Sequence, residues 1–423
     1  MAVDTPAKIA VVGAGPTGLE AALYARYLGY EVELFERGEV AAAFRQSAHL
    51  RMFAPWRECV TPLGIASLAN QDASWRPAAD GDYLTYGEFS ERYLLPLARC
   101  DLLTDCVRER TEVVGLGRET LLKGDYLQDE RRIDVSFRLL VREADGGERI
   151  EPADVVLDCS GVGRSPNWLG NGGVPAIGEQ ATRDRIDYGV PDILGAGREK
   201  FADKQTLVVG SGYGAAAAVT QLAKLAASAP NTRITWAVRR GDESAGGPIV
   251  EIADDPLPAR AALARAANEL ARQPGGVVDY YPATKIEAVD GTGLSGRFAV
   301  EFSGRHPGHA EFDRIVACVG RRPDRVLWSE MQLLECPATG APLPMAELLR
   351  REQATPTLET ATFRRNLAQA LLNPEPDFYV LGAKSYGRRG DYLLGHGQDQ
   401  IRSLFTIIGD RENLDLYAMH KPH

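Results

Sequence analysis

The sequence predicts an α/β protein with two Rossmann-like dinucleotide-binding domains. Two segments, one near the N-terminus and one in the middle of the chain, each read as strand, glycine-rich turn, helix and strand. The length of 423 residues also exceeds the roughly 100–200 residues of one typical domain. Two nucleotide-binding domains therefore explain both the repeated pattern and the length.

The first segment begins with the apolar run at residues 8–12 and has a glycine turn at residues 13–18. Gly13 permits the tight turn, Gly15 lets the backbone approach a pyrophosphate, and Gly18 lets the helix pack closely on the strand. The helix N-terminus offers free N–H groups to the phosphates, and an acid ending the second strand binds ribose hydroxyls. The residues predicted to contact this dinucleotide are Gly13, Gly15, Pro16, Thr17, Gly18 and Glu36, with Arg37 and Arg45 shortly after them.

The second segment begins with the strand at residues 205–209 and has the pattern G-x-G-x-x-A. Its predicted contacts are Gly210, Ser211, Gly212, Tyr213, Gly214 and Ala215. Arg239 and Arg240 follow its second strand, where the first segment has an acid. Because guanidinium groups pair with a 2′-phosphate, the arginines favour NADP(H) over NAD(H). The alternative is a solvated arginine pair at a strand end.

Composition excludes several other classes of protein. The net charge of −10 and the pI near 5.3 argue against a nucleic-acid binder. No apolar run reaches the roughly 20 residues that span a bilayer, and no signal-peptide core precedes the first strand, so we expect a cytoplasmic protein. The six cysteines form no C-x-x-C pair and no zinc-like cluster with histidine, so we expect reduced thiols and no metal site.

With both turns in place, nearly the whole chain resembles the two-dinucleotide-binding-domain flavoproteins. That superfamily includes flavin-containing monooxygenases, thioredoxin-reductase-like enzymes and pyridine nucleotide-disulfide oxidoreductases. The resemblance implies three-layer ββα domains: an FAD-binding domain at residues 1–165 plus 317–423, with an NADPH-binding domain at 166–316 inserted in it. It also implies a β-meander at about 119–157, after a strand at 107–114.

Further cofactor contacts come from the same resemblance. The segments 155–167 and 314–324 look like the crossover motifs that close each domain, and 377–409 looks like the last FAD-binding segment. The residues that these segments and the adenine site contribute are Val113, Ser160, Gly161, Gly320, Gly382, Gln400 and Ile401.

The resemblance implies an FAD- and NADPH-dependent oxidoreductase and leaves its reaction open. One hypothesis is a monooxygenase that oxygenates a small molecule with molecular oxygen through a C4a-hydroperoxyflavin, although the F-x-G-x-x-x-H signature of such enzymes is absent. An alternative is a reductase that passes electrons to a thiol/disulfide compound, a quinone or a protein acceptor, and the least favoured is a non-catalytic flavoprotein. A classical dithiol relay is disfavoured, because no cysteine pair is present and Thr17 stands in the turn where a single-cysteine variant has its thiol.

Several residues are candidates for the chemistry beside the flavin. Lys384 could tune the flavin as a nearby cation, and His396 could act in acid–base chemistry or as a structural hydrogen-bonding residue. Cys59 is the one cysteine retained as a candidate thiol, and Asp254-Asp255 could bind a cationic substrate or form a solvated loop. Homodimers are common in the resembling families.

Overall fold

The computed structural model describes residues 5–163, 165–241, 247–291, 296–353 and 361–420. The chain divides into two compact units: a first unit of Met1–Ser165 and Arg322–His423, and a second unit of Pro166–Arg321. The second boundary follows Arg321 and not residue 316, because the backbone after the last strand of the second unit still pairs within that unit, where Asn167 N donates to the Gly320 carbonyl at 3.0 Å.

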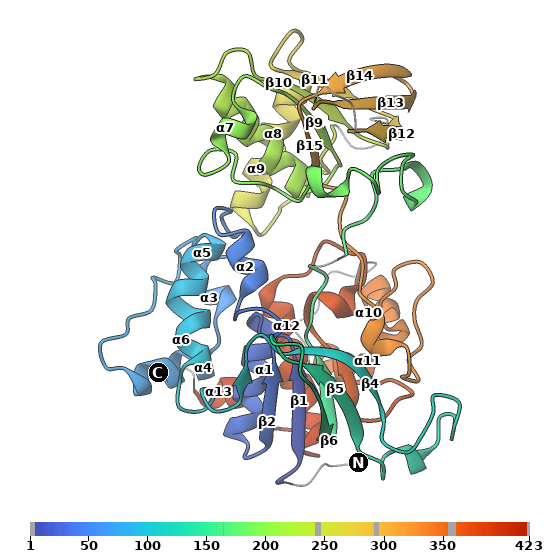
Figure 1. Ribbon diagram of the computed structural model, residues 1–423. Coiled ribbons are helices and arrows are strands. Elements are labelled where there is room, and N and C mark those ends of the chain that lie inside the picture. The colour runs from blue at the N-terminus through green and yellow to red at the C-terminus, as the bar shows by residue number, and fades with distance from the viewer. Residues whose placement is uncertain (1–4, 164, 242–246, 292–295, 354–360, 421–423) are drawn as a thin grey trace. The chain divides into compact units, whose positions relative to one another are not determined.

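The first unit contains five parallel strands, a three-stranded meander and most of the helices (Figure 1). Its strands are β1 (Lys8–Val12), β2 (Glu31–Phe35), β3 (Val107–Arg108), β4 (Glu112–Arg118), β5 (Phe137–Arg142), β6 (Glu148–Ala153), β7 (Val155–Asp158) and β16 (Phe378–Val380). Its α-helices are α1 (Pro16–Tyr27), α2 (Ala42–Gln46), α3 (Trp56–Cys59), α4 (Pro62–Gln71), α5 (Tyr86–Phe89), α6 (Leu95–Ala98), α10 (Leu343–Gln353), α11 (Ala361–Ala370), α12 (Leu394–Ile408) and α13 (Leu416–Met419). Shorter helical segments are η1 (Ser90–Leu94), η2 (Glu130–Arg132), η5 (Val326–Trp328) and η6 (Gly382–Tyr386).

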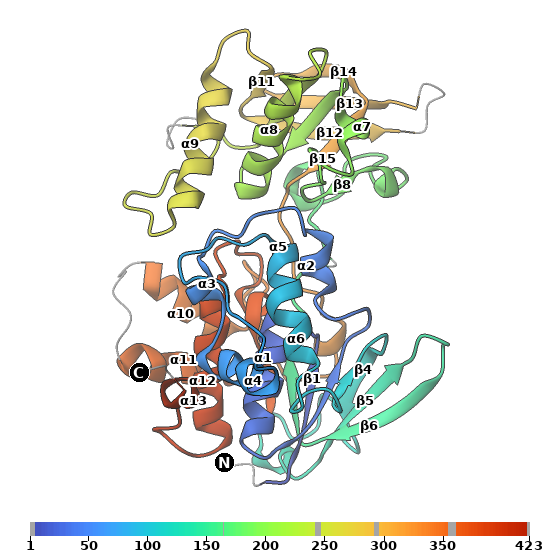
Figure 2. The same ribbon diagram turned by 90° about the vertical axis from the view of Figure 1, so that its left-hand side faces the viewer.

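Side-chain alternation along the strands explains the three layers of this unit. The parallel sheet has the order β16-β7-β1-β2-β3. Ile9 and Val11 of β1 pack in one core with α1 and α12, whereas Ala10 and Val12 pack in another with the meander β4-β5-β6. Because neighbouring residues of a strand face opposite sides, a strand that is apolar throughout is covered on both faces. Figures 1 and 2 show the helices and the meander on opposite faces of this sheet.

The second unit repeats the same plan. Its strands are β8 (Asp187–Tyr188), β9 (Gln205–Val209), β10 (Arg233–Ala237), β11 (Val278–Tyr281), β12 (Thr284–Asp290), β13 (Phe298–Gly304), β14 (Gly308–Phe312) and β15 (Arg314–Ala317). Its helices are α7 (Arg198–Phe201), α8 (Tyr213–Ala226) and α9 (Pro258–Arg272), with the short segments η3 (Asn171–Gly173) and η4 (Arg183–Arg185). The sheet order is β11-β10-β9-β15-β8, with the meander β12-β13-β14 beside it.

The alternation also repeats in β9 of the second unit. Val208 packs with α8 and α9, while Leu207 and Val209 pack with the meander. The predicted α/β class with two Rossmann-like three-layer domains is therefore confirmed. No helix among the described residues combines the length and the apolar character needed to cross a membrane.

The strand predicted at 107–114 is wrong as a single element. Its residues form β3, which pairs with β2, and the start of β4, which belongs to the meander. Arg110 adopts a φ of 53° between them, and its N–H donates to the Gly38 carbonyl at 2.8 Å. This left-handed residue turns the chain from one sheet to the other, and no simple residue signal such as glycine marks it.

A buried ion cluster joins the meander of the first unit to its C-terminal part. Arg118 Nε and Arg132 Nη2 both lie 2.8 Å from the Glu375 carboxylate, and all three side chains are buried. Gln332 N donates to the same carboxylate at 2.9 Å. Segments that are far apart in sequence are thus fixed together at one acid.

Candidate functional site

The glycine turn of the first unit has the geometry that a pyrophosphate site needs. Gly13 has a φ of 103°, and a Cβ on Gly18 would lie 1.9 Å from the Gly13 carbonyl oxygen, so both positions require glycine. A Cβ on Gly15, in contrast, would meet nothing within 4 Å. Gly15 also precedes α1, which begins at Pro16 and has no side-chain cap. The turn is thus tight where it packs and open where a ligand would approach.

Glu36 lies at the end of β2 beside this turn. Its two carboxylate oxygens accept the N–H groups of Ala14 at 3.0 Å and Gly38 at 2.8 Å. Each carboxylate oxygen has a second lone pair, so Glu36 can hold the turn and still accept a ribose hydroxyl. The predicted glycine turn and acid therefore meet at the carboxyl end of the sheet, where ligands of such sheets bind.

The other residues predicted near this end differ in how they are placed. Arg37 is exposed, and the exposed Arg45 forms an ion pair with Glu39. Val113 lies in β4 with its side chain in the core, and its contact with an adenine stays a prediction. Thr111 N donates to the Glu36 carbonyl at 2.8 Å, which sets the start of β4 beside the acid.

Thr17 is the residue at which the N-terminal and C-terminal parts of this site meet. Its hydroxyl lies 2.9 Å from the Tyr392 hydroxyl. A Cβ on Gly382 or on Gly397 would lie 2.9 Å from Thr17 Oγ1, so both glycines allow a close approach. The glycine turn, η6 and the first turn of α12 therefore converge on one side chain.

Gln400 and Ile401 are buried behind this junction. The Gln400 side chain accepts the Gly382 N–H at 2.8 Å and donates to Ser385 Oγ at 2.8 Å. Ile401 is fully buried in the helix-side core. Gln400 therefore supports the loop at Gly382 from behind.

Lys384 lies in a buried ion pair with Asp158. Its ammonium donates to Asp158 Oδ2 at 2.6 Å and to Ser160 Oγ at 2.9 Å, and it is only 1% exposed. Trp328 Nε1 donates to the same Asp158 oxygen at 2.8 Å, and Asp158 Oδ1 accepts the Ser160 hydroxyl at 2.6 Å. The Lys384 ammonium therefore points to Asp158, and its contribution beside a flavin stays a prediction. Gly161, with a φ of 69°, follows this cluster.

His396 lies at the start of α12. Its Nδ1 accepts the Leu393 N–H at 3.1 Å, and its ring stacks on Tyr386 with centroids 5.5 Å apart. Burial lowers the pKa of this imidazole, in agreement with a neutral ring whose Nδ1 is an acceptor. This geometry gives His396 a structural hydrogen bond, and a role in acid–base chemistry stays a prediction.

The glycine turn of the second unit repeats the arrangement of the first. Gly210 has a φ of 133°, and a Cβ there would lie 2.2 Å from the Cys318 carbonyl oxygen. A Cβ on Gly212 would meet nothing within 4 Å, and Gly212 precedes α8, which has no side-chain cap. Ala215 is fully buried at the close-packing position, and Ser211 is exposed.

Other residues of the second unit complete this description. Tyr213 and Gly214 form the first turn of α8 and are partly exposed. Gly320 has a φ of 80° and lies in the chain segment that leaves this unit, where Asn167 contacts it.

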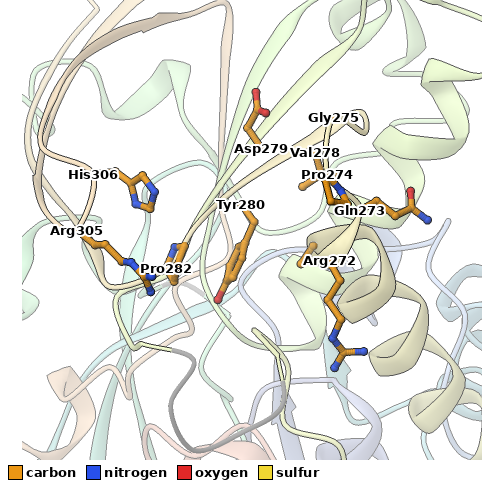
Figure 3. A pocket seen from close by; sticks show the side chains of 11 residues that line it. Arg272, Gln273, Pro274, Gly275, Val278, Asp279, Tyr280, Pro282, Arg305 and His306 are labelled. Atoms are coloured by element: carbon orange, nitrogen blue, oxygen red, sulfur yellow. The ribbon is translucent and has the colours of Figure 1, made fainter.

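Arg239 and Arg240 follow β10 at the same edge of the sheet, and both are exposed. The Arg240 carbonyl accepts the Ala283 N–H at 3.1 Å, and the Ala283 carbonyl accepts the Arg305 N–H at 3.0 Å. A shallow hollow of about 410 Å³ is lined by β11, the neighbouring edge strand, and by residues before and after it in the chain. Figure 3 shows Arg305 and His306 on one side of this hollow and Arg272 on the other.

The acidic pair proposed as a cation site does not have that geometry. Asp255 forms an ion pair with Arg260 at 2.7 Å and accepts the Leu257 N–H at 2.9 Å, so α9 already occupies its carboxylate. Asp254 is exposed and has a φ of 52°. Asp255 therefore organises the start of α9. Among the described residues, no group of three His, Cys, Asp or Glu side chains is arranged to hold a metal.

Sequence reasoning missed Asp158 and Tyr392. Asp158 ends a strand whose other three residues are apolar, and a charge at the end of a buried strand was the available signal. Tyr392 had no such signal, because its partner Thr17 is 375 residues away.

Comparison with known proteins agrees with this geometry. Residues 2–53, which contain the first glycine turn, match the pyridine nucleotide-disulphide oxidoreductase family. Solved structures cover nearly the whole chain. The chain has the fold of the two-dinucleotide-binding-domain flavoproteins. No curated protein matches it.

Three solved structures illustrate the likeness, and all are below 25% identity. A bacillithiol disulfide reductase from Bacillus cereus is 16% identical with a TM-score of 0.66, covering 96% of this chain and 99% of that one. An ornithine N-hydroxylase from Kutzneria is 14% identical with a TM-score of 0.60, covering 96% and 100%. A thioredoxin reductase from T. acidophilum is 12% identical with a TM-score of 0.56, covering 94% and 97%. The fold is thus shared by reductases and by a hydroxylase.

Proposed function

We propose that the chain is an oxidoreductase that holds FAD in its first unit and accepts hydride from NADPH bound in its second unit. The carrying observation is the pair of glycine turns, each tight where it packs and open at the glycine before an uncapped helix. The Kutzneria enzyme of the same fold was solved with reduced FAD, NADP⁺ and L-ornithine. Bound FAD would supply the redox chemistry, and the chain would supply position and charge.

The residues of the first unit fit such a cofactor by their donor set. The Gly15 region and the α1 N-terminus offer N–H groups to phosphates, and Glu36 offers carboxylate lone pairs to a ribose. Gly382 and Gly397 let the C-terminal segment approach Thr17 closely, which brings that segment to the glycine turn. The first turn of α12 would place the positive end of its dipole beside a reduced flavin.

The residues of the second unit favour NADPH over NADH. Arg239 and Arg240 are exposed at the strand end next to the second glycine turn. Two guanidinium groups there would pair with the 2′-phosphate of NADPH, whereas NADH has only a hydroxyl at that position.

For the reaction itself, we propose oxygenation of a small molecule as the first candidate. Burial raises the pKa of the Cys59 thiol to about 12 and that of Cys159 well above its usual range. Both thiols are buried, and the structure records each of the six cysteines as free. Because the thiolate is the reactive form, Cys59 and Cys159 are poor candidates for a thiol relay.

The second candidate is an NADPH-dependent reductase acting on a disulfide compound, a quinone or a protein acceptor. The likeness to the bacillithiol disulfide reductase and the thioredoxin reductase favours it. A reductase of this chain would then deliver electrons directly from its cofactor.

A stopped-flow experiment with the purified protein tests these proposals. The protein should be yellow, and anaerobic NADPH should bleach it faster than NADH does. After mixing with oxygenated buffer, a transient absorbance that precedes the oxidised spectrum and shortens with a nucleophilic substrate supports oxygenation. Direct return of the oxidised spectrum, with faster turnover when a quinone or disulfide is added, supports the reductase. A colourless protein that FAD does not reconstitute refutes the main proposal.

A further inference from the structure

Glu20 is an acid buried in the helix layer of the first unit, one turn beyond the glycine turn. It is 3% exposed and lies on α1. The Thr61 hydroxyl donates to Glu20 Oε2 at 2.8 Å, and the Tyr93 hydroxyl donates to Glu20 Oε1. Thr61 N also donates to the Tyr93 hydroxyl at 3.2 Å. The carboxyl is therefore held by hydroxyl groups, and no cation is paired with it in the described part of the chain.

A second tyrosine interacts with this acid. Tyr417, on α13, is buried and interacts electrostatically with Glu20. Arg402, the cation close to Tyr417, is held by Asp399 and Asp415. A carboxylate in such surroundings would carry an uncompensated buried charge, which is costly, so the neutral acid is the favoured form. Burial raises the pKa of Glu20 to about 7.

A small cavity connects this acid to the glycine turn. Its walls are formed by Pro16, Thr17, Glu20, Cys59, Tyr93, Leu394, Gln398 and Ile401. Its volume of about 10 Å³ is close to the least that one water molecule requires, and several of its walls are polar. A water there would have the polar side chains of Thr17, Glu20, Tyr93 and Gln398 in the cavity wall.

Thr17 lines the same cavity as Glu20 and Tyr93. It is on the same face of α1 as Glu20, since residues three apart on a helix are neighbours. Its hydroxyl is 2.9 Å from the Tyr392 hydroxyl at the start of α12. Glu20 and Thr17 thus line one cavity, and Thr17 lies within hydrogen-bond distance of Tyr392.

We propose that Glu20 is the internal proton store of the first unit and exchanges its proton, through one water in the cavity and the Thr17 hydroxyl, with Tyr392 at the edge of the flavin site. This inference rests on the proposed function. In this transfer the cavity water and the Thr17 and Tyr392 hydroxyls would each take one proton and release their own, so that each stays neutral and the net proton would go to the reduced cofactor of the proposed function. Glu20 is left as a carboxylate, which its Thr61 and Tyr93 donors stabilise until a proton returns from solvent. Because Glu20 does not touch the cofactor site, it is a positioning residue that acts through Thr17.

An infrared pH titration tests whether Glu20 holds the proton, and it does not require a cofactor. The wild-type protein should show the carbonyl stretch of a protonated carboxyl that disappears around pH 7, and Glu20→Gln should lack it. The matched control is Glu91→Gln, which changes an exposed acid on η1 and should keep the band. A band that survives in Glu20→Gln, or a wild-type protein with none above pH 6, overturns the assignment.

The pH dependence of flavin reduction and reoxidation tests the path. Wild-type rates should fall as pH rises through 7, while Glu20→Gln should be flat and slower at pH 6 by roughly 10²-fold, the lower end for general acid–base catalysis. Thr17→Val should show the same kinetic loss and keep the infrared band, which covers the case that Glu20→Gln does not fold. Unchanged pH profiles in Thr17→Val, or in a folded Glu20→Gln, refute the path. A protein without flavin refutes the proposed function, and the titration still decides the state of Glu20.

Discussion

Replacing Lys384 by methionine should destabilise the first unit through the acid that it leaves behind. Lys384 and Asp158 are 1% and 0% exposed and lie 2.6 Å apart. In Lys384→Met the Asp158 carboxylate keeps its Trp328 and Ser160 donors and loses its cation. Removing one partner of a buried ion pair costs about 3–5 kcal/mol, because the remaining charge is uncompensated.

This loss can be measured by thermal and denaturant unfolding of the whole chain, followed by tryptophan fluorescence. Trp328 is a local reporter, because the Lys384 ammonium lies 5.0 Å from its ring centroid. At the low end of the usual relation for large domains, about 2 °C per kcal/mol, the midpoint of the first unit should fall by roughly 6–10 °C. The transition of the second unit should not move.

Two further variants separate charge from packing. Lys384→Met combined with Asp158→Asn removes the uncompensated charge and should recover most of the lost stability. Lys8→Met breaks a partly exposed pair with Glu151, where both side chains are 21% exposed, and should cost less than about 1 kcal/mol. If Lys384→Met lowers the free energy of unfolding by no more than Lys8→Met does, then leaving the buried Asp158 charge without its cation is not costly, and the reasoning fails.

Three other predictions concern the two nucleotide sites and the thiols. The Gly15→Ala variant should fold with near-normal stability but should no longer bind FAD. The Gly18→Ala variant should give less folded protein, because its Cβ would lie 1.9 Å from a backbone atom. Equal losses of stability in the two variants would contradict the open geometry at Gly15. Replacing both Arg239 and Arg240 by Ala should raise KM for NADPH at least tenfold more than KM for NADH, and steady-state assays that show equal changes would remove the 2′-phosphate argument. Burial raises the pKa of the Cys59 thiol to about 12, so Cys59 should react with a chromogenic disulfide at pH 8 only after the protein unfolds. The Cys59→Ser variant should still oxidise NADPH. Rapid labelling of Cys59 in the native protein would make it a candidate redox thiol again.

The sequence was sufficient for features that depend on neighbouring residues. The turns at Gly13 and Gly210 could be placed because strand, turn and helix follow one another within each segment, and each has the positive φ that makes glycine necessary. The covered faces of β1 and β9 were foreseeable in the same way, since the last four residues of β1 and the last three of β9 are apolar.

Features that depend on distant residues could not be read in this way. Lys384 meets an acid 226 positions earlier, so the sequence presented it as a free cation beside a cofactor. Glu20 lies in a run of alanine and leucine, where its burial was foreseeable, but the Thr61 and Tyr93 hydroxyls that bind it come from other helices. Propensity and periodicity carry no information about which side chains meet across the fold.

The two chain crossings between the units lie next to each other. Arg322 N donates to the Ser165 carbonyl at 2.8 Å, so the chain leaves the first unit and returns to it at neighbouring residues. Pro166 and Arg321 form a bridge at the corresponding ends of the second unit. A short loop could therefore close the first unit after excision of the second, and joined ends could circularise the excised piece. The architecture has the form of one chain segment inserted within another.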